Sequence, residues 1–288
     1  MSGGLALDRG TLWVAWYEKT AHVAPFDWNG RSVARGFSFC DARIGRASVR
    51  DLALDDDRNL WIADEASSRL RRFSVFGQEL GGLGLPLDEP LLDEPRAEAE
   101  NDAPSKVRRP TAVVASGDSD GLELLVGCGG ARRHALQLFT GEGQLISTLR
   151  SLGDPHARFQ GISGLCRRER LIAICEEHAD RIQIFRDLDF HYSIVLPADF
   201  RPTDLKFLSG DRLLISGAPG VFIYTIASRD LHQLAPKTDP FDNPLALAVE
   251  ERSTDRKSRL AVLDRLATRI QVLNLQGRLY GTFTPQTP

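Results

Sequence analysis

Two small sets of side chains in this 288-residue chain are candidates for holding a metal ion, and the members of each set are far apart in the sequence. Asp51, Asp204 and Asn243 carry the oxygen atoms that a hard cation such as Ca²⁺ prefers. Three histidines could supply nitrogen ligands to zinc: His22, His134 and His178. A zinc site needs three or four converging ligands, so either site requires a fold that brings distant segments together.

Other catalytic signals are weak. The stretch "GISGL" at 161–165 resembles G-x-S-x-G but departs from it at the last position and lies in a predicted strand. The sequence contains no phosphate-binding P-loop and no GxGxxG before a helix. The four cysteines are scattered without a CxxC pair, which is typical of reduced thiols that fill a core: Cys40, Cys128, Cys166 and Cys175. We therefore expect no cofactor and, on balance, no enzyme.

The composition indicates a globular protein in the cytoplasm of a bacterium. Apolar residues make up 42% and charged residues 26% of the chain, and the net charge is −3. The 31 arginines against 5 lysines are typical of a genome rich in G and C. The N-terminus lacks the pattern of a signal peptide, and no apolar stretch is long enough to span a membrane. The acidic balance argues against nucleic acid as a partner.

One eleven-residue phrase occurs three times: "ADEASSRLRRF" at 63–73, "CEEHADRIQIF" at 175–185 and "LDRLATRIQVL" at 263–273. In each copy an acid stands five residues before an arginine, giving the pairs Asp64 and Arg69, Glu176 and Arg181, and Asp264 and Arg269. The second and third copies begin 88 residues apart, which is two units of 44. The phrase therefore belongs to an internal repeat.

Each repeat contains four short segments with the alternation and turn residues of β-strands, such as 51–55, 60–64, 69–74 and 78–83. Six units cover nearly the whole chain: 3–45, 47–84, 105–150, 156–196, 198–237 and 240–284. A proline-rich insert with seven acids, 85–104, separates the second from the third. We expect it to be either a solvated spacer or a loose lid over arginines.

Units of this size cover one another when they are packed radially. The sequence thus predicts a single all-β domain over 1–288, a six-bladed β-propeller of four-stranded antiparallel blades. The first unit begins with its innermost strand and the last ends with its outermost, so we expect closure without strand swapping.

The segments "RNLWIAD", "RPTAVVA" and "DRLATRIQVLNLQGRLYGTF" resemble NHL repeats, strongly in units 47–84 and 240–284 and less elsewhere. The resemblance implies a six-bladed propeller whose acid and arginine lie at the corner between the second and third strands of a blade. Some NHL propellers bind RNA, and other six-bladed propellers, of the gluconolactonase type, are metal-dependent hydrolases. Both functions stay open as alternatives.

In such blades, the corners and the segments that lead into the first strands share one face of the ring. We interpret the acid–arginine pairs as structural contacts within blades. The segments leading into the first strands supply the predicted binding residues, which are Arg50, Asp51, Arg109, Thr111, Arg201, Asp204 and Asn243. The corners add His178, Arg132 and Arg133, and we expect five arginines of this face to lack an acidic partner.

The histidines fall at corners, away from the axis, so the fold is not expected to bring them together as zinc ligands. The favoured hypothesis is a monomeric, non-catalytic interaction scaffold. It would bind a protein or peptide, possibly an acidic one, through this arginine-rich face.

Overall fold

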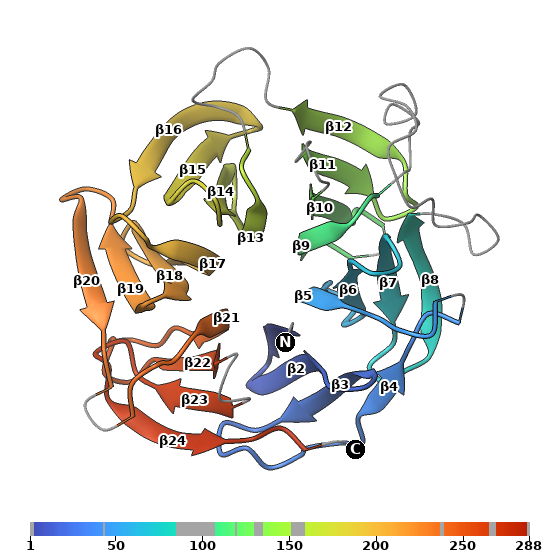
Figure 1. Cartoon of the computed structure of the whole chain (residues 1–288), viewed down its shortest axis with the longest axis horizontal. Helices are drawn as coiled ribbons and strands as arrows, with labels where there is room; N and C mark the ends of the chain where they lie inside the picture. The colour runs from blue at the N-terminus through green and yellow to red at the C-terminus, as the bar shows by residue number, and fades with distance from the viewer. Residues whose placement is uncertain are drawn as a thin grey trace.

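A computed structural model describes residues 3–42, 44–84, 107–118, 120–129, 135–150, 159–236, 239–264 and 269–286. In this part of the chain, 24 strands form six four-stranded antiparallel sheets arranged radially around a central axis (Figure 1). Each sheet uses four consecutive strands in sequence order, from the axis outward. The predicted six-bladed propeller is confirmed. None of the described segments is a helix that could span a membrane.

The first three blades span the N-terminal half of the ring. Blade one contains β1 (Gly3–Asp8), β2 (Thr11–Tyr17), β3 (Ala21–Phe26) and β4 (Phe37–Phe39). Blade two contains β5 (Val49–Leu54), β6 (Leu60–Asp64), β7 (Arg69–Phe73) and β8 (Glu79–Gly84). Blade three contains β9 (Pro110–Ser116), β10 (Glu123–Cys128), β11 (Ala135–Thr140) and β12 (Leu145–Arg150).

The last three blades repeat the pattern. Blade four contains β13 (Ile162–Arg168), β14 (Leu171–Glu176), β15 (Arg181–Arg186) and β16 (Asp189–Val195). Blade five contains β17 (Arg201–Leu208), β18 (Arg212–Ala218), β19 (Gly220–Thr225) and β20 (Asp230–Leu234). Blade six contains β21 (Pro244–Glu250), β22 (Arg259–Asp264), β23 (Arg269–Leu273) and β24 (Leu279–Phe283).

The core lies between blades. Six clusters of buried apolar residues fill the six junctions, one cluster for each pair of neighbouring blades. The second strands are buried along most of their length because both faces of each sheet meet another blade. A fully buried side chain such as Phe139 stabilises the fold by about 1.5–3 kcal/mol. No single blade could bury both of its faces alone, so the ring is the unit that folds.

The ring closes between blades six and one without strand swapping, as predicted. β1 is the innermost strand of blade one, and β24 is the outermost strand of blade six. The ring of Phe283, at the end of β24, lies 5.6 Å from that of Phe26 in blade one. The Arg259 guanidinium lies 5.8 Å from the Trp28 ring centroid across the same junction.

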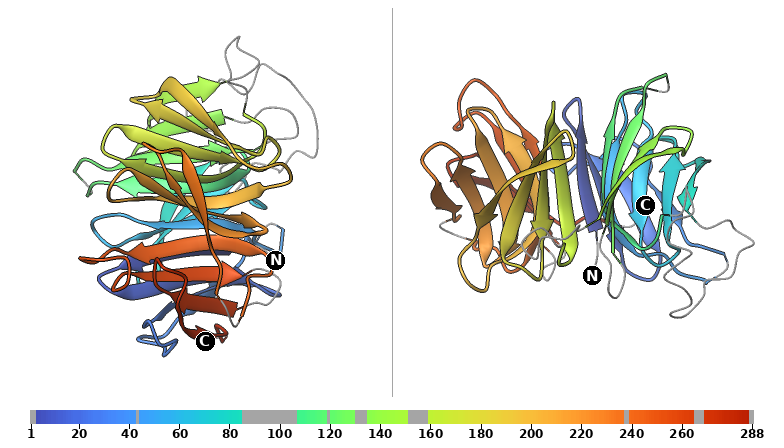
Figure 2. Two further views of the ribbon diagram at one scale, coloured as in Figure 1. Left: turned by 90° about the vertical axis from the view of Figure 1, so that its left-hand side faces the viewer. Right: turned by 90° about the horizontal axis from the view of Figure 1, so that it is seen from above.

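The loops gather at two opposite faces of the ring, which Figure 2 shows from the side. We call the face with the loops between second and third strands, and with the segments leading into first strands, the corner face. The turns between strands one and two, and between strands three and four, form the hairpin face.

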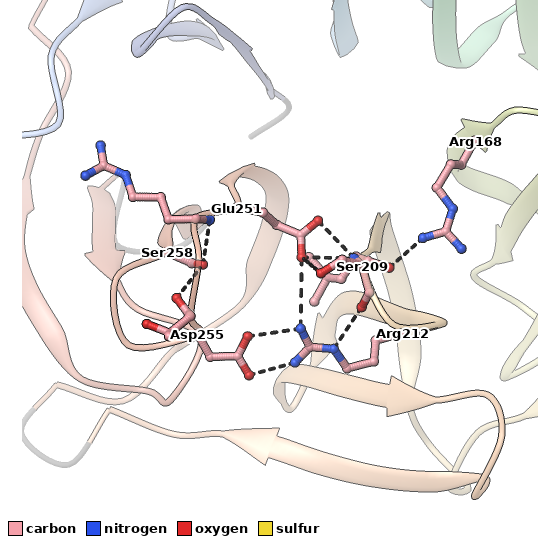
Figure 3. A network of polar contacts seen from close by, with 9 residues as sticks. Arg168, Ser209, Arg212, Glu251, Asp255 and Ser258 are labelled. Carbon is pink, nitrogen blue, oxygen red and sulfur yellow. Dashed lines mark hydrogen bonds and ion pairs between the residues drawn. The ribbon is translucent and has the colours of Figure 1, made fainter.

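Cross-blade polar contacts fasten the hairpin face. In blades four to six, Arg168 donates to the Leu208 carbonyl (2.6 Å) and the Ser209 amide donates to Glu251 (2.9 Å), as Figure 3 shows. Arg212 makes a bidentate pair with Asp255 (2.7 and 3.0 Å). Bidentate arginine–carboxylate pairs add geometric specificity as well as energy, so these contacts also fix the angle between blades.

Candidate functional site

The repeated acids hold the segments that lead into the first strands on the corner face. Asp64, Glu176 and Asp264 are all completely buried at the ends of their second strands. Each accepts hydrogen bonds from backbone amides just before the first strand of its own blade. The bonds are Ser48 N to Asp64 (2.8 Å), Gln160 N to Glu176 (2.6 Å), and Asn243 N and Asp242 N to Asp264 (2.7 and 2.9 Å). The acid recurs because it supplies an acceptor to amides that would otherwise be buried without one.

Two of the three expected acid–arginine contacts are present. Arg181 Nε lies 2.6 Å from Glu176, and Arg269 Nη2 lies 3.2 Å from Asp264. Both arginines are largely covered, with side-chain exposures of 13% and 20%. The pairs hold corners within blades, and they leave little of either guanidinium to face a ligand.

Blade two departs from this expectation. Asp64 faces Arg71 at 3.7 Å, whereas Arg69 turns to Glu79 at 3.9 Å. Arg71 is buried against the rings of Phe39 and Phe73 and also makes a bidentate pair with Glu79. Blades four and six have a neutral glutamine at this position, Gln183 and Gln271. Gln183 donates to Glu176 (2.6 Å) beside Arg181, so the glutamine adds a hydrogen bond without replacing the arginine. A second cation two residues along the strand thus explains the exchanged partners.

The predicted binding arginines differ in how far they are already paired. Arg109 donates to Glu65 at 2.7 Å with its side chain 55% exposed, and Arg50 approaches the same carboxylate at 3.6 Å. The expectation that both lack an acidic partner is therefore wrong. Sequence analysis missed Glu65, although it directly follows the repeated acid. Arg201 is exposed and has no ion pair among the described residues.

The remaining polar candidates of this face have structural contacts or lie outside the described residues. Thr111 is buried and donates to the Gly127 carbonyl (3.2 Å), and the Asn243 amide is held by Asp264. His178 is exposed beside Gly161. The predictions for Arg132, Arg133, His134 and the insert 85–104 fall on residues outside the described part.

Two further predicted residues, Asp51 and Asp204, lie not on the rim but in the ring's centre, on β5 and β17 of opposite blades (Figure 1). Each is at least nine-tenths buried, and each bridges two blades through its carboxylate. Asp51 accepts from Leu52 N (2.8 Å) and from Val113 N of blade three (2.9 Å). Asp204 accepts in the same way from Leu205 N (2.7 Å) and from Leu247 N of blade six (2.8 Å).

These aspartates belong to a ring of six equivalent positions. In every blade, this first-strand residue pairs with the second-strand residue that precedes the position of the repeated acid. In chain order the residues are Gly4, Asp51, Ala112, Gly164, Asp204 and Ala246. Opposite blades therefore carry the same residue, so the ring's centre has an approximate two-fold repeat of three blades.

The two glycines of this ring are required by close backbone approach. A Cβ on Gly4 would lie 2.7 Å from Leu52 N, and one on Gly164 would lie 2.8 Å from the Asp204 Cα. The first strands of blades one and four thus pack directly against β5 and β17. The aspartates of β5 and β17 in turn accept amides from blades three and six. A larger residue at either glycine would push two inner strands apart.

One lysine breaks the two-fold repeat. Lys206, two residues after Asp204, places its ammonium 2.8 and 3.0 Å from the two oxygens of that carboxylate, and blade two has Ala53 at the matching position. Burial and the nearby Asp204 charge raise the pKa of Asp51 to about 7, against the opposing effects of Lys206 and two backbone hydrogen bonds. Burial disfavours the charged form of Lys206, but Asp204 and Asp51 together raise its pKa above the ordinary value.

The residues do not assemble the metal sites considered from the sequence. No group of three His, Cys, Asp or Glu side chains suited to a metal ion occurs in the described ranges. Both oxygens of Asp51 and of Asp204 already accept backbone amides, and Lys206 adds its ammonium to Asp204. A cation at this place would have to displace that ammonium, so the donor set does not fit a hard metal ion.

The histidines are also separated. His22 is buried in blade one, stacked on Trp16 and hydrogen-bonded to Ser38 (2.7 Å), whereas His178 lies in blade four on the other side of the ring. Burial raises the pKa of the Cys128 and Cys166 thiols to about 12, so neither is a thiolate nucleophile at neutral pH. These side chains act in packing and in local hydrogen bonds.

Solved structures with the same architecture come from proteins of different activities. A virginiamycin B lyase from Staphylococcus aureus is similar with a TM-score of 0.62 and 13% identity, covering 99% of this chain and 85% of that one. A chain of a nidogen/laminin complex is similar with a TM-score of 0.65 and 14% identity, covering 96% and 93%. A Bacteroides caccae protein of unknown function gives 0.60 and 10%, covering 91% and 89%. No model of a sequence family matches the chain, and no curated protein matches it significantly.

At these identities the similarities show the propeller fold alone. Lyases and binding proteins share it, so the function has to be argued from side chains.

Proposed function

We propose that this protein is a non-catalytic scaffold of the NHL-repeat type, monomeric and cytoplasmic in a bacterium, that binds an acidic protein or peptide segment on its corner face. The observation that carries the proposal is a group of four charged side chains on the corner face, three arginines near the start of the first strands of blades two, three and five and the corner residue Glu65. Three arginines stand there, Arg50, Arg109 and Arg201, and the first two share the single carboxylate of Glu65. Three positive charges against one negative leave a net charge of +2.

The arrangement favours an elongated ligand. Glu65 holds Arg109 at the corner, so part of the ordering cost for that long side chain is met before binding. Arg201 lies on blade five, opposite blade two in the ring (Figure 1). An acidic segment that contacts Arg50 and Arg201 together must therefore cross the mouth of the central channel. Two acidic residues of this face, Glu177 at the corner of blade four and Asp242 just before the first strand of blade six, would direct it along this line.

The proposal is tested with peptides selected from a random display library on the purified protein. We expect the selected peptides to be rich in Asp and Glu and to bind more weakly as salt rises, because such attraction is screened over about 8–10 Å at physiological salt. Arg201→Glu should weaken binding of the best peptide by about tenfold or more in fluorescence anisotropy.

The matched control is Arg229→Glu. Arg229 is an exposed arginine of the same blade, in the turn between β19 and β20 on the hairpin face. This variant should leave the affinity within about twofold of the original value. Equal losses in both variants would show only non-specific attraction, and selected peptides without acids would contradict the proposal.

A further inference from the structure

The hairpin face has a feature independent of the proposed function: a cleft of about 200 Å³ between blades three and four. Four aliphatic side chains line it: Leu125 and Leu138 from blade three, and Ile172 and Leu188 from blade four. Arg167, Arg170 and Asp187 complete the lining. The cleft thus combines an apolar wall with two guanidinium groups.

The cleft lies at a junction where the inner strands lack a carboxylate bridge. The ring position before this junction is Ala112, whereas the junctions between blades two and three and between five and six have the bridging Asp51 and Asp204. Among the described residues of the hairpin face, one ion pair crosses this junction, Arg167 Nη1 to Glu123 at 2.5 Å. The Glu123 side chain is 40% exposed, so another carboxylate can replace it on the arginine without a buried charge being left.

The wall of the cleft includes a residue in an unfavourable conformation. Asp187 and Leu188 form the two-residue turn between β15 and β16, with φ values of +50° and +71°. Glycine or asparagine usually occupies such positions, and a bulky leucine there is an outlier. Leu188 nevertheless packs against the apolar cluster of blades three and four. Its side chain is therefore held over the cleft at a cost in backbone energy, as occurs at ligand sites.

The two arginines of the lining each pair with one carboxylate, Glu123 or Asp187, and Arg186 beside Asp187 adds a further positive charge, so this group of side chains has a net charge of +1. Arg170 pairs with Asp187 and is 77% exposed, so most of its donors face solvent. The hydrogen bond from Arg170, together with the charges of Arg186 and Arg167, lowers the pKa of Asp187. Anions are thus attracted to the mouth, while the aliphatic wall favours an apolar body.

We propose that this cleft binds a small aliphatic monocarboxylate, with its hydrocarbon chain against Leu125, Leu138, Ile172 and Leu188 and its carboxylate on Arg167 and Arg170. The cleft is smaller than those that hold drug-sized molecules, so the ligand is a short-chain or medium-chain acid. Its few atoms set the affinity, with a Kd on the order of 1 mM for octanoate.

The experiment titrates the purified protein with octanoate, and separately with octanol, while amide shifts are followed by NMR. We expect shifts at blades three and four, and octanoate should bind at least about fivefold more tightly than octanol. Arg170→Gln should remove that difference and leave octanol binding unchanged. Arg229→Gln, an exposed arginine elsewhere on the hairpin face, serves as the matched control and should change neither ligand.

Two variants of the aliphatic lining test the proposal independently, so that one remains informative if the other folds poorly. Leu138→Trp should fill the cleft and abolish binding of both ligands, with folding checked by the thermal melt. Leu188→Gly should relieve the turn and enlarge the cleft, shifting the preference toward a longer chain such as decanoate. Absence of octanoate binding at millimolar concentration, equal affinity for octanol, or unchanged binding in Leu138→Trp would overturn the proposal.

Discussion

Asp51 and Asp204 occupy equivalent positions on opposite sides of the ring and do the same structural work. Each accepts the amide of the following residue and one amide from the next blade, at distances that agree within 0.1 Å (2.8 and 2.9 Å against 2.7 and 2.8 Å). They differ in one neighbour, because Lys206 contacts Asp204 and blade two has Ala53 instead. The backbone contacts of each aspartate are therefore set by its position in the blade. Whether the charge of its carboxylate is compensated depends on a single neighbouring side chain.

This difference separates two tasks at the centre of the molecule. The bridge between blades needs only two acceptor oxygens, so both aspartates can provide it. Only Asp204 also has a cation within hydrogen-bond distance. Asp51 accepts two amides and feels the Lys206 charge only from a distance, and its raised pKa follows from burial near a second acid. The ring thus contains one compensated and one uncompensated version of the same bridge.

The largest expected effect is on the compensated side. Asp204→Ala removes the bridge to blade six and leaves the Lys206 ammonium without its partner, which should cost about 3 kcal/mol of unfolding free energy at pH 7. Asp51→Ala removes a similar bridge but also relieves an acid that ionises unfavourably, so about 1 kcal/mol is expected. Urea unfolding of both variants measures the difference, and equal costs would contradict the role given to Lys206.

A second effect concerns the pH dependence of stability. The folded pKa of Asp51, about 7, lies above the ordinary value of 3.8, so the folded state favours the protonated acid. The stability from this group is fully present below pH 3.8 and is lost as pH rises through 7, to a total of about 2–4 kcal/mol.

The measurement is the difference in unfolding free energy between the original protein and Asp51→Asn across this range. The difference should fall from pH 4 to pH 8, because the asparagine variant has no proton to lose at this site. Parallel curves would show that Asp51 titrates alike in the folded and unfolded chains.

The smallest expected effect is a change in the pKa of Asp51 when blade two is given the lysine that blade five has. Ala53→Lys places an ammonium at the position that Lys206 occupies in blade five, and it should lower the pKa of Asp51 by about one unit. The pH dependence described above would then move to lower pH by the same amount. Ala53→Gln is the control with a long polar side chain and no charge. If both variants shift the pKa alike, solvation rather than charge is responsible.

The propeller fold could be predicted from the sequence because the repeated residues have a structural role in the blades that carry them. The acid at the end of a second strand has to cap the amides that lead into the first strand, so it recurs in register in blades two, four and six. Strand bounds such as 60–64 followed from alternation and turn residues and match β6. Spacing alone could also reveal the unswapped closure, because no segment was left over.

The side-chain partners were harder to foresee, because they depend on distances between blades. Nothing in the repeat shows that Arg71 would outcompete Arg69 for Asp64. That choice rests on two phenylalanine rings, Phe73 of the same strand and Phe39 of the preceding blade. Glu65 could have been found, as an acid next to a conspicuous one, but its two arginines come from different blades. Lys206 is recognised as exceptional only when the six blades are aligned and the residues two places after Asp204 and its five equivalents are compared.

Asp51 and Asp204 thus join neighbouring blades at the ring's centre. Lys206 compensates the charge of Asp204 and leaves Asp51 to titrate near neutrality. The most direct measurement is the side-chain carboxyl ¹³C shift of Asp51, assigned with the Asp51→Asn variant and followed from acid to alkaline pH. We expect a midpoint near pH 7, and a shift of that midpoint further upward in Lys206→Met. A midpoint near 3.8, unchanged by the loss of Lys206, would contradict it.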